Sequence, residues 1–182
     1  FLGMAKRDTR QEILEAAGRI VLASGASGLT LEAVAAEAGL SKGGLLYHFA
    51  TKEELLTGMV ERLVALTEAN IEKSGGGDRG EGSWSRGYLA CAVDPSGREP
   101  FDRLATSVLA AAANDPALLA PLRAQERVWR ERRRADGLDP VTAAIVRLAA
   151  DGLWMNDLFG IEVLSAQERK AVAARLEEMT RQ

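Results

Sequence analysis

The chain has 182 residues, of which 47% are hydrophobic and 27% are charged. These ordinary globular values exclude a disordered chain and a collagen-like one, and the length suits one compact domain or two small ones. A single cysteine, Cys91, cannot form an internal disulfide, and one cysteine with one histidine makes no zinc site without several carboxylates. No stretch approaches 18 uninterrupted apolar residues. We therefore expect a folded cytoplasmic protein without a membrane segment, a metal or another cofactor.

The net charge of −3, from 23 Lys and Arg against 26 Asp and Glu, argues by itself against a nucleic-acid partner. The charge is unevenly distributed, however. Residues 1–52 contain six basic and five acidic residues, and the rest of the chain contains 17 basic and 21 acidic ones. Because this asymmetry is weak, only the placement of individual cations can indicate whether DNA is bound.

Apolar residues recur at helical spacing along the whole chain, and no run alternates at period two between turn signals. The sequence therefore predicts an all-α fold of about nine helices. Five helix starts carry capping signals: Thr9 with Glu12, Thr51 with Glu54, Ser165 with Glu168, and the Asp-Pro pairs at 115–116 and 139–140. Further helices are expected at 31–38, 42–48, 84–93 and 100–113, and the helix that begins after Thr51 at 52–73. The glycine-rich residues 74–83 predict a flexible loop.

Residues 30–56 predict a helix-turn-helix. Thr30 caps a short helix, Gly39 ends it in a left-handed conformation, and Ser41 caps the next helix. The small Ala35 allows the two helices to cross closely. Two helices of about two turns, joined by a glycine-containing turn and crossing steeply, are typical of this motif.

The second of these helices has an outward face suited to a DNA groove. That face consists of Lys42, Gly43, Gly44, Tyr47 and His48. Lys42 lies beside a helix N-terminus, where free N–H groups favour a phosphate, and the glycines let backbone approach a duplex. Lys52 lies at the start of the following helix. We favour DNA contact for His48 and Tyr47 over a core histidine, a catalytic base or a tyrosine that merely covers apolar surface.

The block from Thr30 to Leu56 resembles the DNA-binding signature of the tetracycline-repressor (TetR) family over 27 residues without a gap. The resemblance implies a helix-turn-helix DNA-binding domain at residues 4–50 and a ligand-binding and dimerisation domain at 51–182. It further implies that the following residues face double-stranded DNA: Thr30, Ser41, Lys42, Gly43, Gly44, Tyr47, His48 and Lys52. The family usually has Tyr where this chain has Leu46, and Gly44 replaces a more usual polar residue. We therefore expect specificity to rest more on Lys42, Tyr47, His48 and DNA shape.

The C-terminal part contains bulky residues that belong either to a core or to a small-molecule pocket. The candidates for a pocket are Met59, Leu63, Trp84, Tyr88, Cys91, Phe101, Trp129, Trp154 and Met155. Cys91 reads first as a small buried apolar residue and otherwise as a redox sensor. A dimer face is expected from small and apolar residues of the helices at 140–159 and near the C-terminus. Its candidates are Ala144, Leu148, Gly152, Phe159 and Leu176, which in a monomer would be ordinary core.

The arginine run at 130–134 favours a solvated helical face with Glu–Arg pairs four residues apart, with a second DNA surface as the alternative. Taken together, the sequence predicts a homodimeric repressor that a small-molecule effector releases from a pseudo-palindromic operator. Repression is the commonest mode in the resembled family. Two alternatives remain open. One is a helix-turn-helix protein whose bundle only dimerises or binds another protein, and the other is an all-α enzyme, for which no catalytic set is visible.

Overall fold

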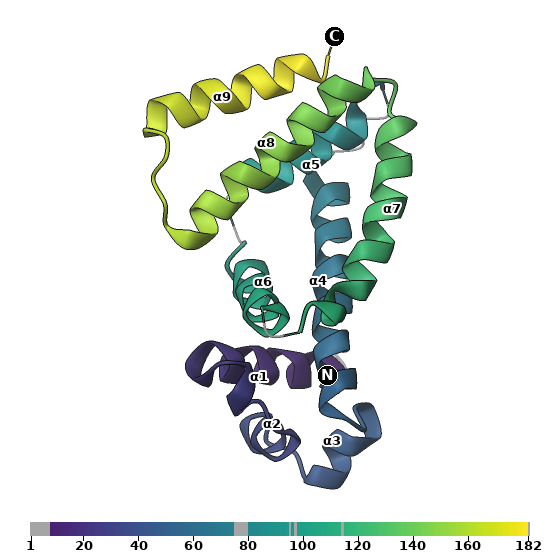
Figure 1. Ribbon diagram of the computed structural model, residues 1–182, viewed down its shortest axis with the longest axis vertical. Helices are drawn as coiled ribbons and strands as arrows, with labels where there is room; N and C mark the ends of the chain where they lie inside the picture. Colours follow the sequence, from purple (N-terminus) through teal and green to yellow (C-terminus); the bar gives the residue numbers. More distant parts are fainter. Residues whose placement is uncertain (1–7, 75–79, 95, 97, 114, 182) are drawn as a thin grey trace, which may run out of the picture. The chain divides into compact units, whose positions relative to one another are not determined.

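The computed structural model describes residues 8–74, 80–94, 96, 98–113 and 115–181, which form nine α-helices, two short 3-10 helices and no strand (Figure 1). The α-helices are α1 (Thr9–Ser24), α2 (Leu31–Glu37), α3 (Lys42–His48), α4 (Lys52–Ser74), α5 (Ser83–Val93), α6 (Glu99–Ala112), α7 (Ala120–Arg134), α8 (Pro140–Phe159) and α9 (Ala166–Met179). The 3-10 helices are Ala26–Gly28 and Pro116–Leu119. The predicted all-α fold is confirmed. Of the predicted loop at 74–83, residues 75–79 lie outside the described residues.

The capping signals are only partly confirmed. Ser165 and Glu168 form the predicted capping box at the start of α9, and the Asp139 side chain accepts a hydrogen bond from the backbone N–H of Thr142 at 2.8 Å. At α1 the prediction is wrong by one residue. Asp8, not Thr9, is the cap and accepts from the Gln11 N–H at 3.3 Å, because an aspartate is as good a cap as a threonine and precedes it.

Two other helix starts differ in detail from the expectation. The Thr51 hydroxyl accepts from the Glu54 N–H at 3.1 Å, but the Glu54 carboxylate accepts from the Ala50 N–H rather than from Thr51. Asp115 caps a 3-10 helix that begins at Pro116, and the α-helix starts only at Ala120. The sequence signals therefore locate helix starts to within a few residues.

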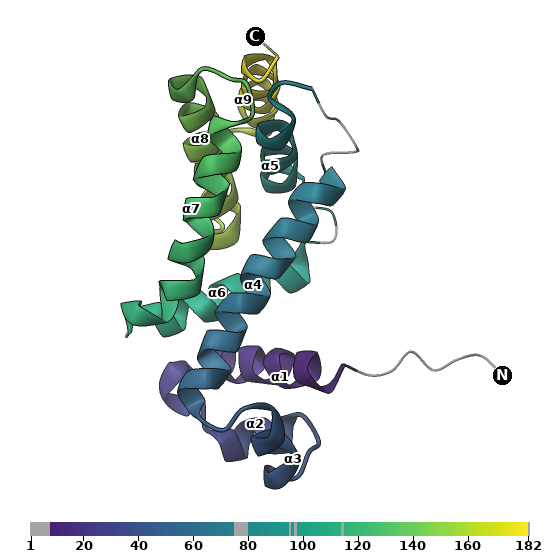
Figure 2. The ribbon, with the colours of Figure 1, turned by 90° about the vertical axis from the view of Figure 1, so that its right-hand side faces the viewer.

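The described residues group into two compact units. The first unit contains α1, α2, α3, residues 52–64 of α4, residues 100–112 of α6 and the first four residues of α7. In this unit α1 packs on α2 and α2 on α3 (Figure 2), and Leu14, Leu45 and Phe49 are buried in its core. The Ser107 hydroxyl of α6 shares its proton between the Arg103 carbonyl of its own helix at 2.8 Å and the Gly18 carbonyl of α1 at 3.1 Å. Core packing and this buried hydrogen bond hold the helix-turn-helix against its support.

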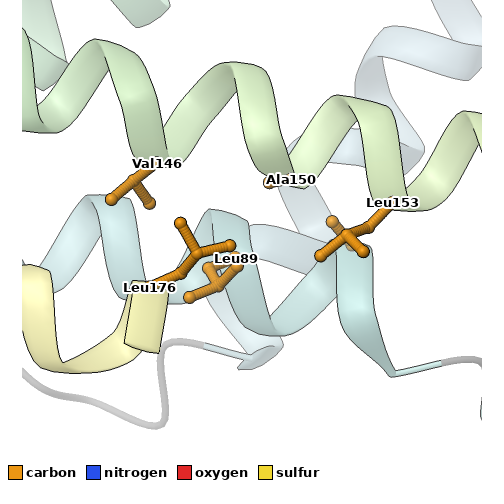
Figure 3. Packing of buried hydrophobic residues seen from close by; sticks show 6 residues of the cluster. Leu89, Val146, Ala150, Leu153 and Leu176 are labelled. Atoms are coloured by element: carbon orange, nitrogen blue, oxygen red, sulfur yellow. The ribbon is translucent and has the colours of Figure 1, made fainter. Parts of the chain in front are cut away.

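The second unit contains residues 65–74 of α4, α5, most of α7, α8 and α9. Its core lies where α5, α8 and α9 meet (Figure 3). Leu89 of α5 packs there with Val146 and Leu153 of α8 and Leu176 of α9, and the fully buried Ala150 lets α8 lie close to α5. The boundary predicted between residues 50 and 51 stays a prediction, since α4 contributes residues to both units.

The start of α5 is fixed by one buried aspartate. The Asp136 carboxylate accepts from the backbone N–H groups of Trp84 and Ser85 at 2.8 and 2.9 Å, which satisfies donors that a helix N-terminus leaves free. Gly82 precedes them at a φ of 74°, and a Cβ there would collide with the Thr180 carbonyl oxygen. The aromatic side chains of α5 are therefore held on a fixed backbone.

Candidate nucleic-acid interface and the interior of the second unit

The helix-turn-helix forms as the sequence predicts. Gly39, at a φ of 68°, makes the turn between α2 and α3. The hydroxyls of Thr30 and Ser41 accept from the backbone N–H groups of Ala33 and Gly44, each at 3.1 Å. The two hydroxyls thus cap helices and remain exposed, with their own protons available to an outside acceptor.

The exposed face of α3 carries Lys42, Gly43, Leu46 and Tyr47. Tyr47 is 86% exposed, an unusual position for a large aromatic residue, and its ring meets the half-buried His48 edge-on at 5.2 Å between centroids. The sequence predicts Lys42, Gly43, Tyr47 and His48 on this outward face, whereas Leu46 is noted only because it replaces a tyrosine of the resembled family. The apolar side chain of Leu46 is exposed next to Tyr47.

Both lysines of the predicted interface already have partners in their own unit, which the sequence did not indicate. The Lys42 ammonium lies 2.6 Å from a carboxylate oxygen of Glu32 on α2, and its hydrogen bond lowers the pKa of Glu32 below the usual value. The half-buried Lys52 donates to the Ala26 carbonyl at 2.8 Å. An ammonium has three protons, so Lys52 keeps two donors for a phosphate. Glu32 is thus a neighbour of the interface that sequence reasoning missed.

The two glycines of α3 have different surroundings. A Cβ on Gly43 would meet nothing within 4 Å, whereas a Cβ on Gly44 would lie 3.3 Å from the capping hydroxyl of Ser41. The close approach of the capping hydroxyl therefore explains why position 44 has a glycine. Among the described residues, none lies within 4 Å of a Cβ at Gly43, which fits a position kept clear for an outside partner.

In the second unit, three of the predicted pocket residues come together. The rings of Trp84 and Tyr88 stack at 5.5 Å between centroids, and Trp129 meets Tyr88 edge-on at 6.5 Å. Cys91 and Trp154 are half-buried in this unit, and Met155 is exposed. The other three candidates belong to the first unit: Met59, Leu63 and Phe101.

Arg147 of α8 reaches into this aromatic cluster. Its guanidinium carbon lies 3.9 Å from the Tyr88 ring centroid and 5.8 Å from that of Trp129. It pairs with Glu126 at 3.1 Å, and it also hydrogen-bonds to Asp151 and to the Tyr88 hydroxyl. Burial raises the pKa of the Tyr88 phenol well above its usual value, so Tyr88 is neutral at physiological pH. Only the four-residue spacing of Arg147 and Asp151 signalled this network in the sequence.

Glu68, from the part of α4 that belongs to the second unit, is the centre of another network. It accepts hydrogen bonds from the Trp129 indole N–H at 2.5 Å, from Arg132 at 2.6 Å and from Gln125. Arg133 lies 3.7 Å from Glu126. Arg132 therefore pairs with a carboxylate of α4, and Arg133 with one seven residues earlier on α7. The expectation of Glu–Arg pairs four residues apart is wrong for these two arginines.

The predicted dimer residues divide into exposed and buried ones. A stripe of exposed residues runs along α8 in steps of four and three: Val141, Ile145, Leu148, Gly152, Met155 and Phe159. Leu148 is the most exposed of them, at 71%. Ala144 is half-buried, and Leu176 is buried in the core of its own chain (Figure 3). Three of the five candidates thus belong to the stripe.

In the part of the chain that the structure describes, the His, Cys, Asp and Glu side chains form no group of three or more that is suited to a metal ion. None of the helices described is long and apolar enough to cross a membrane.

Comparisons with known proteins agree on one family. The model for the tetracyclin repressor-like C-terminal domain matches residues 82–181, and the one for bacterial regulatory proteins of the tetR family matches residues 13–59. A search of curated proteins found no match.

Solved structures share the fold. A TetR-family transcriptional regulator from Rhodococcus sp. is 21% identical, with 97% of this chain and 100% of that one covered and a TM-score of 0.74. The SmeT–triclosan complex is 23% identical (95% and 90% covered, TM-score 0.72), and the multidrug binding protein EbrR with malachite green is 24% identical (96% and 99%, TM-score 0.66).

Proposed function

Because the chain belongs to the TetR family of bacterial regulatory proteins, we propose that it is a repressor that a small-molecule effector releases from DNA. The observation that carries the proposal is the outward face of α3, where Tyr47 is 86% exposed and Gly43 leaves room for a close approach. A large exposed aromatic beside free backbone fits a surface that a partner covers. The protein acts in the cytoplasm, and the proposal assigns no residue a catalytic role.

The second part of the proposal is a homodimer formed through α8. The exposed stripe from Val141 to Phe159 follows the four-and-three spacing that lets two helices pack side by side. A second copy of the chain presents the same stripe, so a two-fold interface is self-complementary. The dimer places two recognition helices in successive major grooves, about 34–36 Å apart, on a pseudo-palindromic operator.

The effector site is proposed in the second unit, around the aromatic cluster of Trp84, Tyr88 and Trp129. The relatives SmeT and EbrR have structures with triclosan and malachite green, respectively, which supports a small-molecule site in this chain. Coupling runs through α4. Its residues 52–64 belong to the first unit and residues 65–74 to the second, where Glu68 accepts from Trp129. An effector with higher affinity for a displaced α4 shifts the population away from DNA.

Selection from a random pool of duplex DNA tests the DNA-binding part. We expect enrichment of an inverted repeat whose half-sites lie about one helical turn apart, and no enrichment with Tyr47→Ala. Enrichment of unrelated sequences, or equal enrichment by the variant, would show that α3 does not read DNA.

The dimer is tested by Leu148→Glu, which places a charge in the centre of the stripe. We expect monomers in sedimentation experiments and a loss of operator affinity of at least tenfold. Ala124→Glu, at an exposed position of α7 outside the stripe, is the matched control and should remain dimeric. A dimer that tolerates Leu148→Glu would place the interface elsewhere.

A further inference from the structure

The surroundings of Arg147 have the composition of a receptor for a flat cation. The guanidinium lies over the face of Tyr88 at 3.9 Å and near the ring of Trp129 at 5.8 Å, and electron-rich ring faces attract cations. Tyr88 stacks in turn on Trp84. The aromatic rings therefore supply flat, neutral surfaces that suit a planar, delocalised charge.

Carboxylates complete these surroundings. Glu126 lies 3.1 Å from the guanidinium and Asp151 hydrogen-bonds to it. Arg133 also faces Glu126, at 3.7 Å. Without the Arg147 side chain, the position would hold two carboxylates and one arginine, a net charge of −1. A single positive charge is needed to neutralise it.

Arg147 supplies this charge but leaves one of its own hydrogen-bond donors unsatisfied. Its side chain is only 14% exposed, and its Nε–H is buried without a hydrogen-bond partner. The indole N–H of Trp84, in the ring stacked on Tyr88, is likewise buried and unpartnered. Native proteins rarely leave buried donors unsatisfied. Both donors belong to side chains that contact Tyr88. Ser85 Oγ and Arg133 Nη1 are also buried without a hydrogen-bond partner, so three of these four atoms belong to this cluster or to its ion pairs.

We propose that this cluster is a binding site for a planar aromatic cation, such as an amidinium or guanidinium compound, whose place Arg147 takes in the structure. The ligand cation lies against Tyr88 and Trp129 and pairs with Glu126 and Asp151, while Arg147 turns out to solvent. As the identity of the effector, this inference rests on the proposed function.

An anionic ligand is the obvious competing possibility, because Arg147 is a cation in an aromatic cluster. Its two Nη atoms, however, already donate to Glu126, Asp151 and the Tyr88 hydroxyl. An anion would meet those carboxylates along with a neutralised arginine, and like charges at close range repel. The geometry therefore favours a cation, and the test compares the two directly.

Three compounds of nearly equal shape make that comparison: 4-phenylbenzamidine, which is cationic, biphenyl-4-carboxamide, which is neutral, and biphenyl-4-carboxylate, which is anionic. Their binding to the full-length protein is measured by calorimetry at fixed ionic strength. We expect the amidine to bind at least tenfold more tightly than either of the others. Equal or tighter binding of the carboxylate, or no binding of the amidine, would overturn the proposal.

Two variants locate the site. Glu126→Gln should weaken amidine binding at least tenfold and leave the binding of the carboxamide unchanged, whereas Glu178→Gln, which removes an exposed partner of Arg175, should change neither. Arg147→Ala should tighten amidine binding, because the competing guanidinium is gone. If Arg147→Ala does not fold, the effect of Glu126→Gln on amidine binding still tests whether the amidine binds at this cluster. Amidine binding that is indifferent to Glu126→Gln would overturn the assignment of the site.

The same titration, repeated with operator DNA bound, separates this inference from the proposed function. Amidine binding at the cluster without release of DNA would leave the cation site standing and contradict its role as effector site. Release of DNA by another compound, with no amidine binding, would contradict the cation site and leave the repressor function standing.

Discussion

The ammonium group of Lys42, at the start of α3, lies 2.6 Å from the carboxylate of Glu32 on α2. The cation that the sequence assigns to a DNA phosphate is therefore already paired within its own unit. DNA must share or displace this pair, and the Glu32 carboxylate also repels nearby phosphates. Glu32 thus limits the contribution of Lys42 to DNA affinity.

We therefore predict that Glu32→Gln increases operator affinity about three- to tenfold and steepens the dependence of the affinity on salt, because one more cation is released for phosphate contact. Fluorescence anisotropy over a salt series measures both effects. Glu37→Gln, which removes the partner of Arg19 at 2.6 Å, is the matched control with no expected change. An unchanged salt dependence for Glu32→Gln would show that Lys42 does not contact phosphate.

Alanine at Gly43 should separate folding from DNA binding. A Cβ at this position meets nothing within 4 Å, and alanine favours a helix over glycine by about 0.5–1 kcal/mol. We expect Gly43→Ala to be at least as stable to urea as the natural chain and yet to bind the operator more weakly. Undiminished DNA binding would show that the backbone at Gly43 does not approach the duplex.

Gly58 of α4 provides the opposite case. A Cβ there would lie 2.7 Å from Phe49 Cε1 and 3.3 Å from Leu14 Cδ2, inside the core of the first unit. Overpacking of a core typically costs about 1–3 kcal/mol, and alanine gains about 0.5–1 kcal/mol over glycine in a helix, so Gly58→Ala should lower the free energy of unfolding by about the difference. Urea unfolding of both glycine variants side by side measures the difference. Equal stability of the two would contradict the packing described for Phe49.

Leu46 offers a gain-of-function test. The resembled family usually has a tyrosine here, and Leu46 is exposed on α3 beside Tyr47. Leu46→Tyr should add a hydroxyl that donates to DNA and raise affinity by about 0.5–1.5 kcal/mol, the usual net value of one hydrogen bond. Leu22→Tyr, at a comparably exposed leucine of α1, should not. An unchanged or lower affinity for Leu46→Tyr would place this side chain away from the DNA.

Most of the fold follows from the sequence because helical periodicity and caps are local signals. The predicted helices at 42–48 and 140–159 coincide with α3 and α8, and Gly39 makes the expected turn. The partners of the site residues did not follow. Glu32 pairs with Lys42 across the turn, and Glu126 pairs with Arg147 of another helix. Such pairs depend on how the helices cross, which local sequence signals do not indicate. Burial is non-local in the same way, so Leu176 and the exposed Leu148 looked alike in the sequence.

The buried phenol of Tyr88 has a consequence at high pH. The pKa of Tyr88 is raised in the folded chain, mainly by burial, so the folded state holds this proton more strongly than the unfolded state does. The resulting stability is complete below the ordinary tyrosine pKa near 10 and is lost as pH rises above it.

In Tyr47→Phe, Tyr88 is the only tyrosine left, so its ionisation can be followed by absorbance at 295 nm. We expect no signal from the folded chain at pH 10 and a signal on unfolding. A further Tyr88→Phe change should remove the signal in both states. Ionisation of Tyr88 near pH 10 in the folded protein would contradict its burial beside Trp84 and Trp129.

DNA binding by the face of α3 is the central claim, and it is measured most directly with duplex DNA from upstream of the protein's own gene over a salt series. We predict tight, sequence-dependent binding that Tyr47→Ala weakens at every salt concentration. Lys52→Ala should reduce the slope of log affinity against log salt concentration by about one. The stability of this variant is measured as well, because Lys52 also donates to the Ala26 carbonyl. Binding that is absent, or indifferent to both changes across many fragments, would contradict a DNA-binding role for this helix-turn-helix.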